Sequence, residues 1–208
     1  MRLLPLIVAL LACFSLARAD TPSVVFDDER YALSFEDQAT LPDGEPGDGI
    51  AEFTLAGESV DNWSKLFAFH AYPEMGDDPV AAVETLGKIV KENNKDANYA
   101  IITNDESGEA MIDFLTWAPE SDVMEFNVFK YARSADGRGL IAMQFAQHVK
   151  LGELDVDGMR ALRVRAVDAM AATDMAQAQA YFANKRSTSA SKAPEEREPA
   201  LARAGRDD

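Results

Sequence analysis

Apolar and polar residues alternate along several short stretches of the chain, which is the pattern of strands with one buried face. Residues 31–35 and 50–55 show this alternation, and residues 63–72 (WSKLFAFHAY) form a longer stretch that ends at Pro73. Both faces of the longer stretch are largely apolar, so it is predicted to be a central strand covered on both sides. The alternation places Trp63, Lys65, Phe67 and Phe69 on one face and Leu66, Ala68, His70 and Tyr72 on the other.

Two other segments have apolar residues three and four positions apart, which is the spacing of a helix that buries one side. The first begins at Asp77-Asp78-Pro79 and ends at Asn93-Asn94, because aspartate and proline favour a helix start. The second is rich in alanine and is predicted to be one long helix over residues 159–183. Between the helices we expect four antiparallel strands joined by polar turns such as Asp136-Gly137. These strands lie at residues 99–103, 110–117, 123–132 and 140–149.

This order of elements predicts one α+β domain, an antiparallel sheet of about six to seven strands with a short helix and a long C-terminal helix packed on it. The same order, with the Glu58-Ser59 to Trp63 stretch that opens the long strand, resembles the PsbP-like α/β/α sandwich. Small exported bacterial proteins of unknown function use similar layouts. The resemblance covers residues 30–183 in element order. It implies a fold, and it brings no catalytic residues with it.

The N-terminus has the pattern of a secretory signal peptide. An uncharged apolar stretch from Leu3 to Leu16 follows Met1-Arg2, and Ala17-Arg18-Ala19 provides the small residues that a signal peptidase reads. We therefore expect a signal peptide over residues 1–19 and a periplasmic or secreted protein. Leu10-Leu11-Ala12-Cys13 also resembles a lipobox, which would make the protein a lipoprotein through Cys13. Cleavage after residue 19 is the favoured interpretation, because leucine at position 11 fits the lipobox poorly.

The remaining chain divides into a folded part and a polar tail. Residues 20–183 are expected to form the single domain, and residues 184–208 contain no aromatic residue. A segment so poor in apolar side chains cannot bury enough surface to fold, so the tail is predicted to be disordered. Nothing after the leader approaches the length of about 18 apolar residues that a membrane span needs, and no span is expected.

The net charge of the chain limits the kinds of partner that the protein is expected to bind. The sequence holds 36 acidic and 20 basic residues, a net charge of −16, and residues 20–183 alone hold 31 acidic and 12 basic residues, a net of −19. Such a domain repels phosphate backbones, so nucleic-acid binding is not expected. Arg160, Arg163 and Arg165 form the one local basic cluster of the folded part. We interpret them as ion-pair partners of Asp157 and Asp168, with anion binding as the alternative.

Candidate chemistry centres on the few titratable residues that share strands with apolar ones. His70 and His148 are the two histidines, and His70 lies in the middle of a strand beside Tyr72, an environment typical of a hydrogen-bonded core histidine. Asp113 and Glu125 alternate with apolar residues on two neighbouring predicted strands, so each points into a pocket or into water. The candidate binding residues are therefore His70, Tyr72, Asp113 and Glu125, and no residue is assigned as catalytic.

Acidic turns are the candidate metal ligands, because calcium prefers carboxylate oxygens. The turn over residues 41–49 (LPDGEPGDG) offers Asp43, Glu45 and Asp48, although solvated turns have the same composition. Residues 153–158 match the start of an EF-hand loop, but Val164 stands where a bidentate glutamate is needed. Asp155 and Asp157 are therefore interpreted as helix caps. Phosphate-binding loops and zinc-type spacings are absent from the sequence, and no cofactor is expected.

We therefore expect a non-enzymatic exported domain that binds another protein or a small ligand. Its more specific form is an acidic partner of a basic protein, of the inhibitor or immunity type, because strong negative charge attracts cationic surfaces. The alternatives are a small periplasmic hydrolase that uses carboxylates with His70 and a calcium-binding accessory protein. Two carboxylates and His70 converging in one cleft would favour the hydrolase, and a flat acidic face would favour the binding domain.

Overall fold

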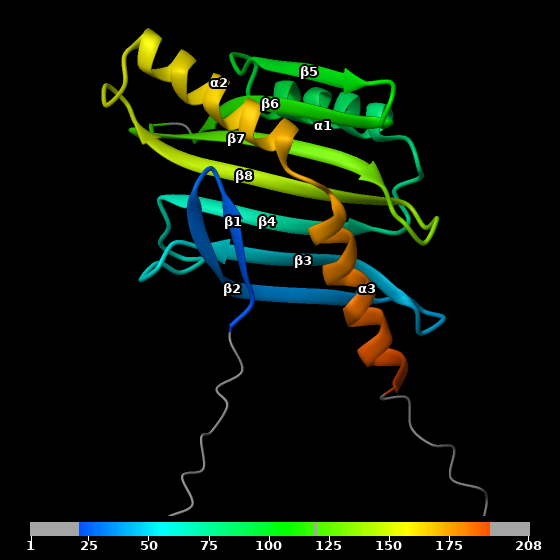
Figure 1. Cartoon of the computed structure of the whole chain (residues 1–208). Helices are drawn as coiled ribbons and strands as arrows, with labels where there is room; N and C mark the ends of the chain where they lie inside the picture. The colour runs from blue at the N-terminus through cyan, green and yellow to red at the C-terminus, as the bar shows by residue number, and fades with distance from the viewer. Residues whose placement is uncertain (1–20, 119, 192–208) are drawn as a thin grey trace, which may run out of the picture.

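Eight antiparallel strands form one sheet in the order β1-β2-β3-β4-β8-β7-β6-β5 (Figure 1). The computed structural model describes residues 21–118 and 120–191. The strands are β1 (Ser23–Phe26), β2 (Glu29–Thr40), β3 (Pro46–Thr54), β4 (Lys65–Tyr72), β5 (Tyr99–Asn104), β6 (Glu109–Trp117), β7 (Val123–Arg133) and β8 (Leu140–Lys150). The helices are α1 (Pro79–Asn93), α2 (Val156–Ala172) and α3 (Ala176–Ser191). The predicted α+β class with an antiparallel sheet is confirmed, with one more strand than expected.

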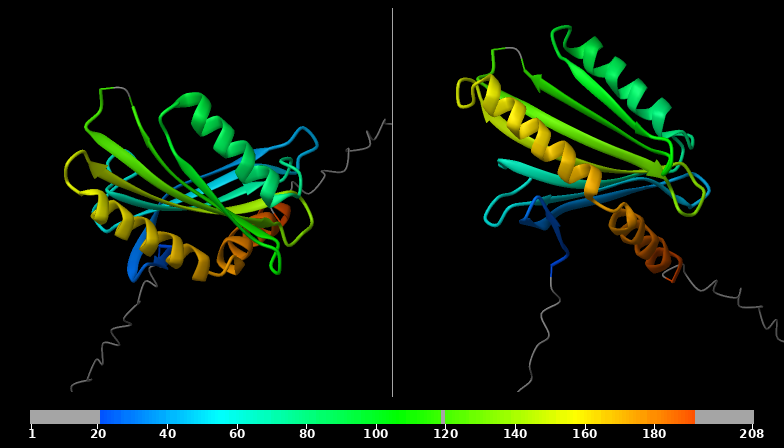
Figure 2. Two further views of the ribbon diagram at one scale, coloured as in Figure 1. Left: turned by 90° about the horizontal axis from the view of Figure 1, so that it is seen from above. Right: turned by 45° about the horizontal axis from the view of Figure 1, so that its top comes forward.

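The helices divide between the two faces of the sheet, as Figure 2 shows. α1 covers the half formed by β5, β6 and β7, where Val83 and Val90 pack against Ile112 and Tyr131. α2 and α3 cover the opposite face, where the larger of the cores lies. Among the described residues, no helix combines the length and apolar character that a membrane crossing requires.

The start of α1 and the four-strand meander follow local signals in the sequence. The Asp78 side chain accepts hydrogen bonds from the backbone N–H groups of Val80 and Ala81, and Pro79 lies in the first turn. β5, β6, β7 and β8 pair in sequence order as antiparallel neighbours. β8 also pairs with β4, which gives β4 the central position expected for the longest apolar stretch.

β1 and the start of β2 lie in residues 20–30, where no element is predicted from the sequence. Val24 and Phe26 are buried and alternate with exposed residues. Asp27 and Asp28 both have positive φ (49° and 62°), the conformation of a two-residue hairpin turn. Aspartate tolerates this conformation better than most residues. The turn lacks the glycine that marks such hairpins in a sequence, so the short strand before it was missed.

The prediction of a single long C-terminal helix over residues 159–183 is also wrong, because α2 and α3 occupy this region. The backbone of Thr173 is extended and ends α2. Asp174 then accepts a hydrogen bond from the backbone N–H of Ala176 (2.8 Å), as an aspartate that begins a helix does. Nζ of the buried Lys130 lies 2.9 Å from the Thr173 carbonyl oxygen. A positive charge at a helix C-terminus is stabilising. Lys130 of β7 therefore stabilises the end of α2 at Thr173.

The ends of the chain extend past the described residues. α3 continues beyond the expected domain boundary at residue 183, to Ser191. The predicted signal peptide with Cys13, and the part of the predicted disordered tail after Ser191, lie outside the described residues.

Trp63 lies in the β3–β4 loop, since β4 begins only at Lys65. Its indole packs with Leu66, on the face of the sheet opposite to Phe67. The predicted shared face of Trp63 and Phe67 is therefore wrong. The alternation holds within β4, but it does not extend into the loop, where the chain turns back over the sheet.

Candidate functional site

The four candidate residues lie on two opposite faces of the sheet. Asp113 in β6 accepts a hydrogen bond from Arg163 of α2 and lies beside Met111 of the larger core. His70 and Tyr72 in β4 point to the other face, and the His70 ring lies 5.9 Å from the ring of Phe129 beneath α1. Asp113 is thus separated from His70 by the thickness of the sheet, and the two do not converge in one cleft.

His70 has the environment of a core histidine. It is 7% exposed, and its Nε2 lies 3.0 Å from Oε1 of Gln144. An amide oxygen only accepts hydrogen bonds, so Nε2 carries the hydrogen in this contact. Burial lowers the pKa of His70 to about 4. The imidazole is therefore neutral near pH 7, and its Nε2–H is used inside the fold.

A row of hydrogen-bonded side chains continues from His70 across the sheet. Gln144 Nε2 donates to Asn127 Oδ1, and Asn127 Nδ2 donates to Glu125 Oε1; each donor–acceptor distance is 2.8 Å. Oε2 of Glu125 lies 3.6 Å from Nε2 of His148. Glu125 is therefore tied into a network that joins β4, β8 and β7. The row depends on the register of three strands, which no local signal in the sequence gives.

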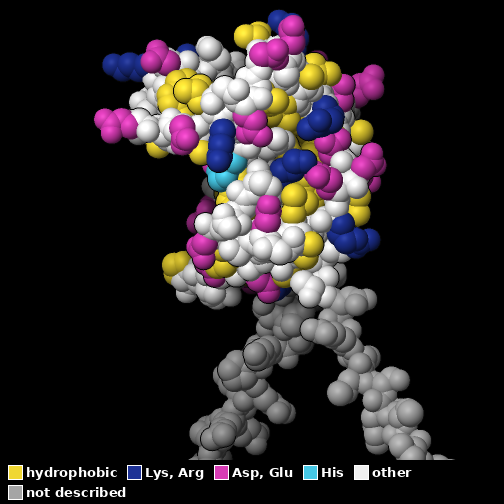
Figure 3. Space-filling view, turned by 90° about the vertical axis from the view of Figure 1, so that its left-hand side faces the viewer, with side chains coloured by type: hydrophobic (Ala, Val, Ile, Leu, Met, Phe, Trp, Pro, Cys, Tyr) yellow, Lys and Arg dark blue, Asp and Glu magenta, His cyan; other side chains and the backbone are white. Residues whose placement is uncertain are grey.

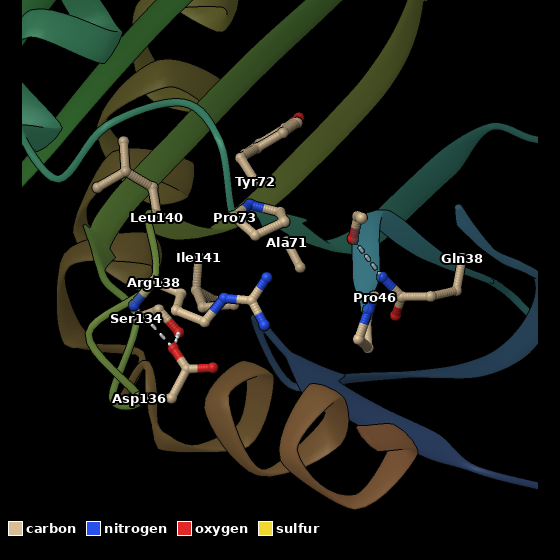
Figure 4. Close-up of a pocket in the computed structure, with 11 residues that line it drawn as sticks. Gln38, Pro46, Ala71, Tyr72, Pro73, Ser134, Asp136, Arg138, Leu140 and Ile141 are labelled. Atoms are coloured by element: carbon tan, nitrogen blue, oxygen red, sulfur yellow. Dashed lines mark hydrogen bonds between the residues drawn. The ribbon is translucent and has the colours of Figure 1, made fainter. Parts of the chain in front are cut away.

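Tyr72 lines a small cavity at the end of the sheet (Figure 4). The cavity also lies beside Pro46, Asp136 and Arg138, and its volume is about 10 Å³. A space of this size holds about one water molecule. Burial, with the negative charge of Asp48 as a second cause, raises the pKa of Tyr72 to about 12. Tyr72 is thus a neutral phenol beside a cavity too small for an organic ligand.

The acidic turn over residues 41–49 does not gather its carboxylates around one point. Asp43 Oδ1 accepts the backbone N–H of Glu45 (3.0 Å), and the Glu45 carboxylate pairs with Arg138 (2.9 Å). Throughout the described ranges, no three His, Cys, Asp or Glu side chains lie close enough together to hold a metal ion. The second acidic segment caps a helix as interpreted, because Asp155 accepts the backbone N–H of Gly158 (2.8 Å).

Asp113 forms a two-pronged ion pair with Arg163 of α2. Arg163 Nε donates to Asp113 Oδ1 at a distance of 2.7 Å, and Arg163 Nη2 donates to Asp113 Oδ2 at a distance of 2.8 Å. The Asp113 side chain is 7% exposed and that of Arg163 44%, and the hydrogen bonds raise the pKa of the guanidinium. Such forked pairs fix orientation as well as charge. The buried carboxylate therefore holds a half-exposed guanidinium in a defined position.

The basic cluster on α2 pairs differently from the sequence prediction. Arg160 bonds to Asp157 (2.7 Å), as expected. Arg165 instead pairs with Asp27 in the β1–β2 turn (2.9 Å), and Arg163 pairs with Asp113. The predicted pairing with Asp168 is therefore wrong, because these arginines reach strands and turns that lie far away in the sequence.

A groove lies between α2 and the β5–β6 edge of the sheet, and we call it the α2–β6 groove. Its volume is about 460 Å³, within the range of about 300 to 1,000 Å³ that small-molecule sites occupy. Arg160 and Arg163 supply its guanidinium groups, and Asp113 lies beside them. Its apolar lining includes Leu115 and Phe126 from the sheet and Val156 and Met159 from α2. Of the candidate residues, Asp113 alone lies in this groove, and sequence reasoning missed the apolar walls because they come from three separate elements.

Comparison with known proteins gives a family for the chain. No curated protein and no solved structure matches it. A family model does match, over residues 19–180, which is more than half of the chain. The protein therefore belongs to this family, which is an uncharacterised one.

Proposed function

We propose that this protein is an exported, non-enzymatic binding domain and that the α2–β6 groove is its binding site. The observation that carries the proposal is the Arg163–Asp113 pair within an apolar groove. Because the pair is preformed, a ligand meets an oriented guanidinium without the cost of ordering a flexible side chain. Ligand sites commonly combine apolar walls with a few fixed polar groups in this way.

The charge of the groove indicates the kind of ligand. Arg160 and Arg163 face one acidic residue, Asp113, among the described lining residues. With Asp157 bonded to Arg160 and Asp113 bonded to Arg163, the groove is close to neutral in a domain whose residues 20–183 carry a net charge of −19. An anionic group meets two guanidinium groups here, whereas most of the remaining acidic surface repels it. The proposed ligand therefore combines an anionic group with apolar surface.

The placement of the titratable residues supports binding over hydrolysis. His70 is neutral, buried and bonded to Gln144, whereas Asp113 lies on the other face of the sheet in an ion pair. General acid–base chemistry needs such groups within hydrogen-bond reach of one substrate. The hydrolase alternative is therefore not the function that we propose.

Export is part of the proposal. The leader pattern over residues 1–19 supports it, and the family match begins at residue 19, next to the expected cleavage point. The placement of α1 on one face of the sheet and of α2 and α3 on the other is consistent with the PsbP-like α/β/α layout that we propose for the family.

Titration with anilinonaphthalene sulfonate, a fluorescent amphipathic anion, tests the binding site. The variant Val156→Asp places a carboxylate in the groove at a residue that is 75% exposed, so the fold should tolerate it. The matched control is Ile89→Asp on α1, which is 46% exposed and lies on the opposite face. We expect saturable binding by the wild type and the control, and binding about tenfold weaker in Val156→Asp. Equal binding by all three proteins would contradict the proposed site.

A second candidate function is the binding of a basic protein, and the loops at the two ends of the sheet favour it. Loops 27–28, 41–45, 55–64, 73–78, 94–98, 105–108, 118–122, 134–139 and 151–155 hold 17 acidic residues and two basic residues. On the side seen in Figure 3, however, Asp and Glu side chains are spread among neutral and basic ones. Poly-L-lysine tests this candidate, because a charge-driven complex forms at low salt and dissociates near physiological salt. Val156→Asp should leave such a complex unchanged.

A further inference from the structure

β5 is an edge strand without the usual protection of an edge. It ends the sheet and pairs with β6 in an unbroken register. Its sequence, YAIITN, contains no charged residue and no proline, although charges, prolines and bulges are the features that keep natural edges from pairing with other chains. The opposite edge, β1, is shorter, with four residues against six. The backbone of β5 therefore offers an open row of hydrogen-bonding groups.

One side of β5 continues the floor of the α2–β6 groove. The register pairs Ala100 with Asp113 and Ile102 with Met111, so these β5 side chains share the face that α2 covers. Ile102 is 41% exposed, and Ala100 lines the groove together with Arg160. A strand added beside β5 would point every second side chain towards this face, and from there into the open side of the groove.

We propose that the partner of this domain is an extended polypeptide segment that adds to the sheet as a strand beside β5. This inference rests on the proposed function, since it uses the same groove. Main-chain hydrogen bonds to β5 supply affinity, and alternate side chains supply specificity, as in other strand-addition complexes. The segment carries apolar side chains that contact Ile102 and Val156 and an acidic side chain that meets Arg160 and Arg163.

Arg160 is the residue best placed to select the acidic side chain. Its partner in the fold is Asp157, in an exposed pair three residues apart on α2, and such pairs contribute little to stability. Arg160 can therefore exchange Asp157 for a partner's carboxylate at little cost. Arg163 keeps its position through Asp113 and adds a second, half-exposed guanidinium to the same wall.

The test uses synthetic peptides of about eight residues, long enough to cover β5. One peptide alternates Val and Glu, and its matched counterpart alternates Val and Lys. Hydrogen exchange of the mature domain, with and without peptide, reports whether the β5 amides become protected. We expect the Val/Glu peptide to slow exchange in β5, and Arg160→Glu and Ile102→Glu to weaken its binding by about tenfold. Ile89→Glu on α1 is the matched control and should bind as the wild type does.

The other outcomes separate this inference from the proposed function. If anilinonaphthalene sulfonate binds the groove but neither peptide protects β5, strand addition is wrong and the groove site stands. If β5 becomes protected only as protein concentration rises, with dimers in sedimentation, the occupant is a second copy of this chain and the inference of a separate partner is overturned. Binding of the Val/Lys peptide without β5 protection would also overturn it and would favour the acidic loops.

Discussion

Glu125 and His148 face each other across β7 and β8, and each nitrogen of the His148 imidazole lies near an oxygen atom. Nδ1 lies 2.9 Å from the backbone oxygen of Trp63, and Nε2 lies 3.6 Å from Oε2 of Glu125. The ring also stacks on the Trp63 indole, with 3.8 Å between centroids. His148 is thus one of the residues that attach the β3–β4 loop to the sheet.

Replacement of His148 should weaken this attachment. We expect His148→Ala to lower the free energy of unfolding by about 1 to 2 kcal/mol, because the stacked ring and the hydrogen bond to the loop are both lost. His148→Phe keeps a ring against Trp63 and should lose about half as much. Urea unfolding at neutral pH measures both values. A wild-type midpoint for His148→Ala would mean that the loop holds its place without this contact.

Replacement of Arg163 should lower the stability of the protein more than replacement of its partner Asp113. Arg163→Met leaves a carboxylate that is 7% exposed without its partner, and we expect a loss of about 3 to 5 kcal/mol. Asp113→Ala leaves a guanidinium that is 44% exposed and that water can solvate, so the loss should be about 1 kcal/mol. The double variant Asp113→Leu with Arg163→Met should recover most of the stability. Equal losses in the two single variants would show that burial does not determine the energetics of this pair.

His70 should make the protein less stable as the solution becomes acidic. Burial lowers its pKa from 6.5 to about 4. Between these values the unfolded chain binds a proton that the folded protein excludes, so stability falls as the pH drops from 6.5 to 4 and is unaffected by His70 above 6.5. The expected loss is on the order of 3 kcal/mol.

A variant of His70 separates its contribution to the pH dependence of stability from that of the carboxylates, which titrate in the same pH range. His70→Gln has no titrating group, so its free energy of unfolding should fall less steeply with acid than that of the wild type. Urea unfolding at several pH values provides the comparison. Parallel curves for the two proteins would show that His70 is not the source of the pH dependence.

Lys130 should be needed at the junction of α2 and α3. Its Nζ lies 3.1 Å from Oε2 of Glu109 and 2.9 Å from the carbonyl oxygen of Thr173. We expect Lys130→Met to cost about 2 to 4 kcal/mol, because partly buried acceptors lose their donor while the apolar stem is kept. Amide exchange near Thr173 should also become faster. Lys88→Met, at an exposed position of α1, is the control and should change stability by less than about 0.5 kcal/mol.

Elements with local signals could be predicted from the sequence. The Asp78-Pro79 start of α1 and the polar turns of the β5–β8 meander each depend on a few neighbouring residues. The break at Thr173 and the turn at Asp27-Asp28 were missed because aspartate in these places resembles ordinary polar sequence. In both cases the missing signal was a backbone conformation, which composition and periodicity do not report.

The candidate site could be predicted only in part, because it is assembled by long-range pairing. Asp113 was identified from its alternation with apolar residues, but its partner Arg163 lies 50 positions away in the sequence. The position of His70 in a strand indicated a hydrogen-bonded core histidine, but its partner Gln144 lies 74 positions away in the sequence. The direction of a strand side chain could be inferred locally, whereas its neighbour depends on the register and on how α2 crosses the sheet.

A chemical-shift map of the isotope-labelled domain during titration with anilinonaphthalene sulfonate tests the α2–β6 groove directly as the binding site. Binding in the α2–β6 groove predicts that the largest amide shifts cluster in the first half of α2, around Val156 and Arg160, and in the adjoining parts of β5 and β6. Shifts that cluster on α1 or in the acidic loops, with the α2–β6 groove unchanged, would contradict it.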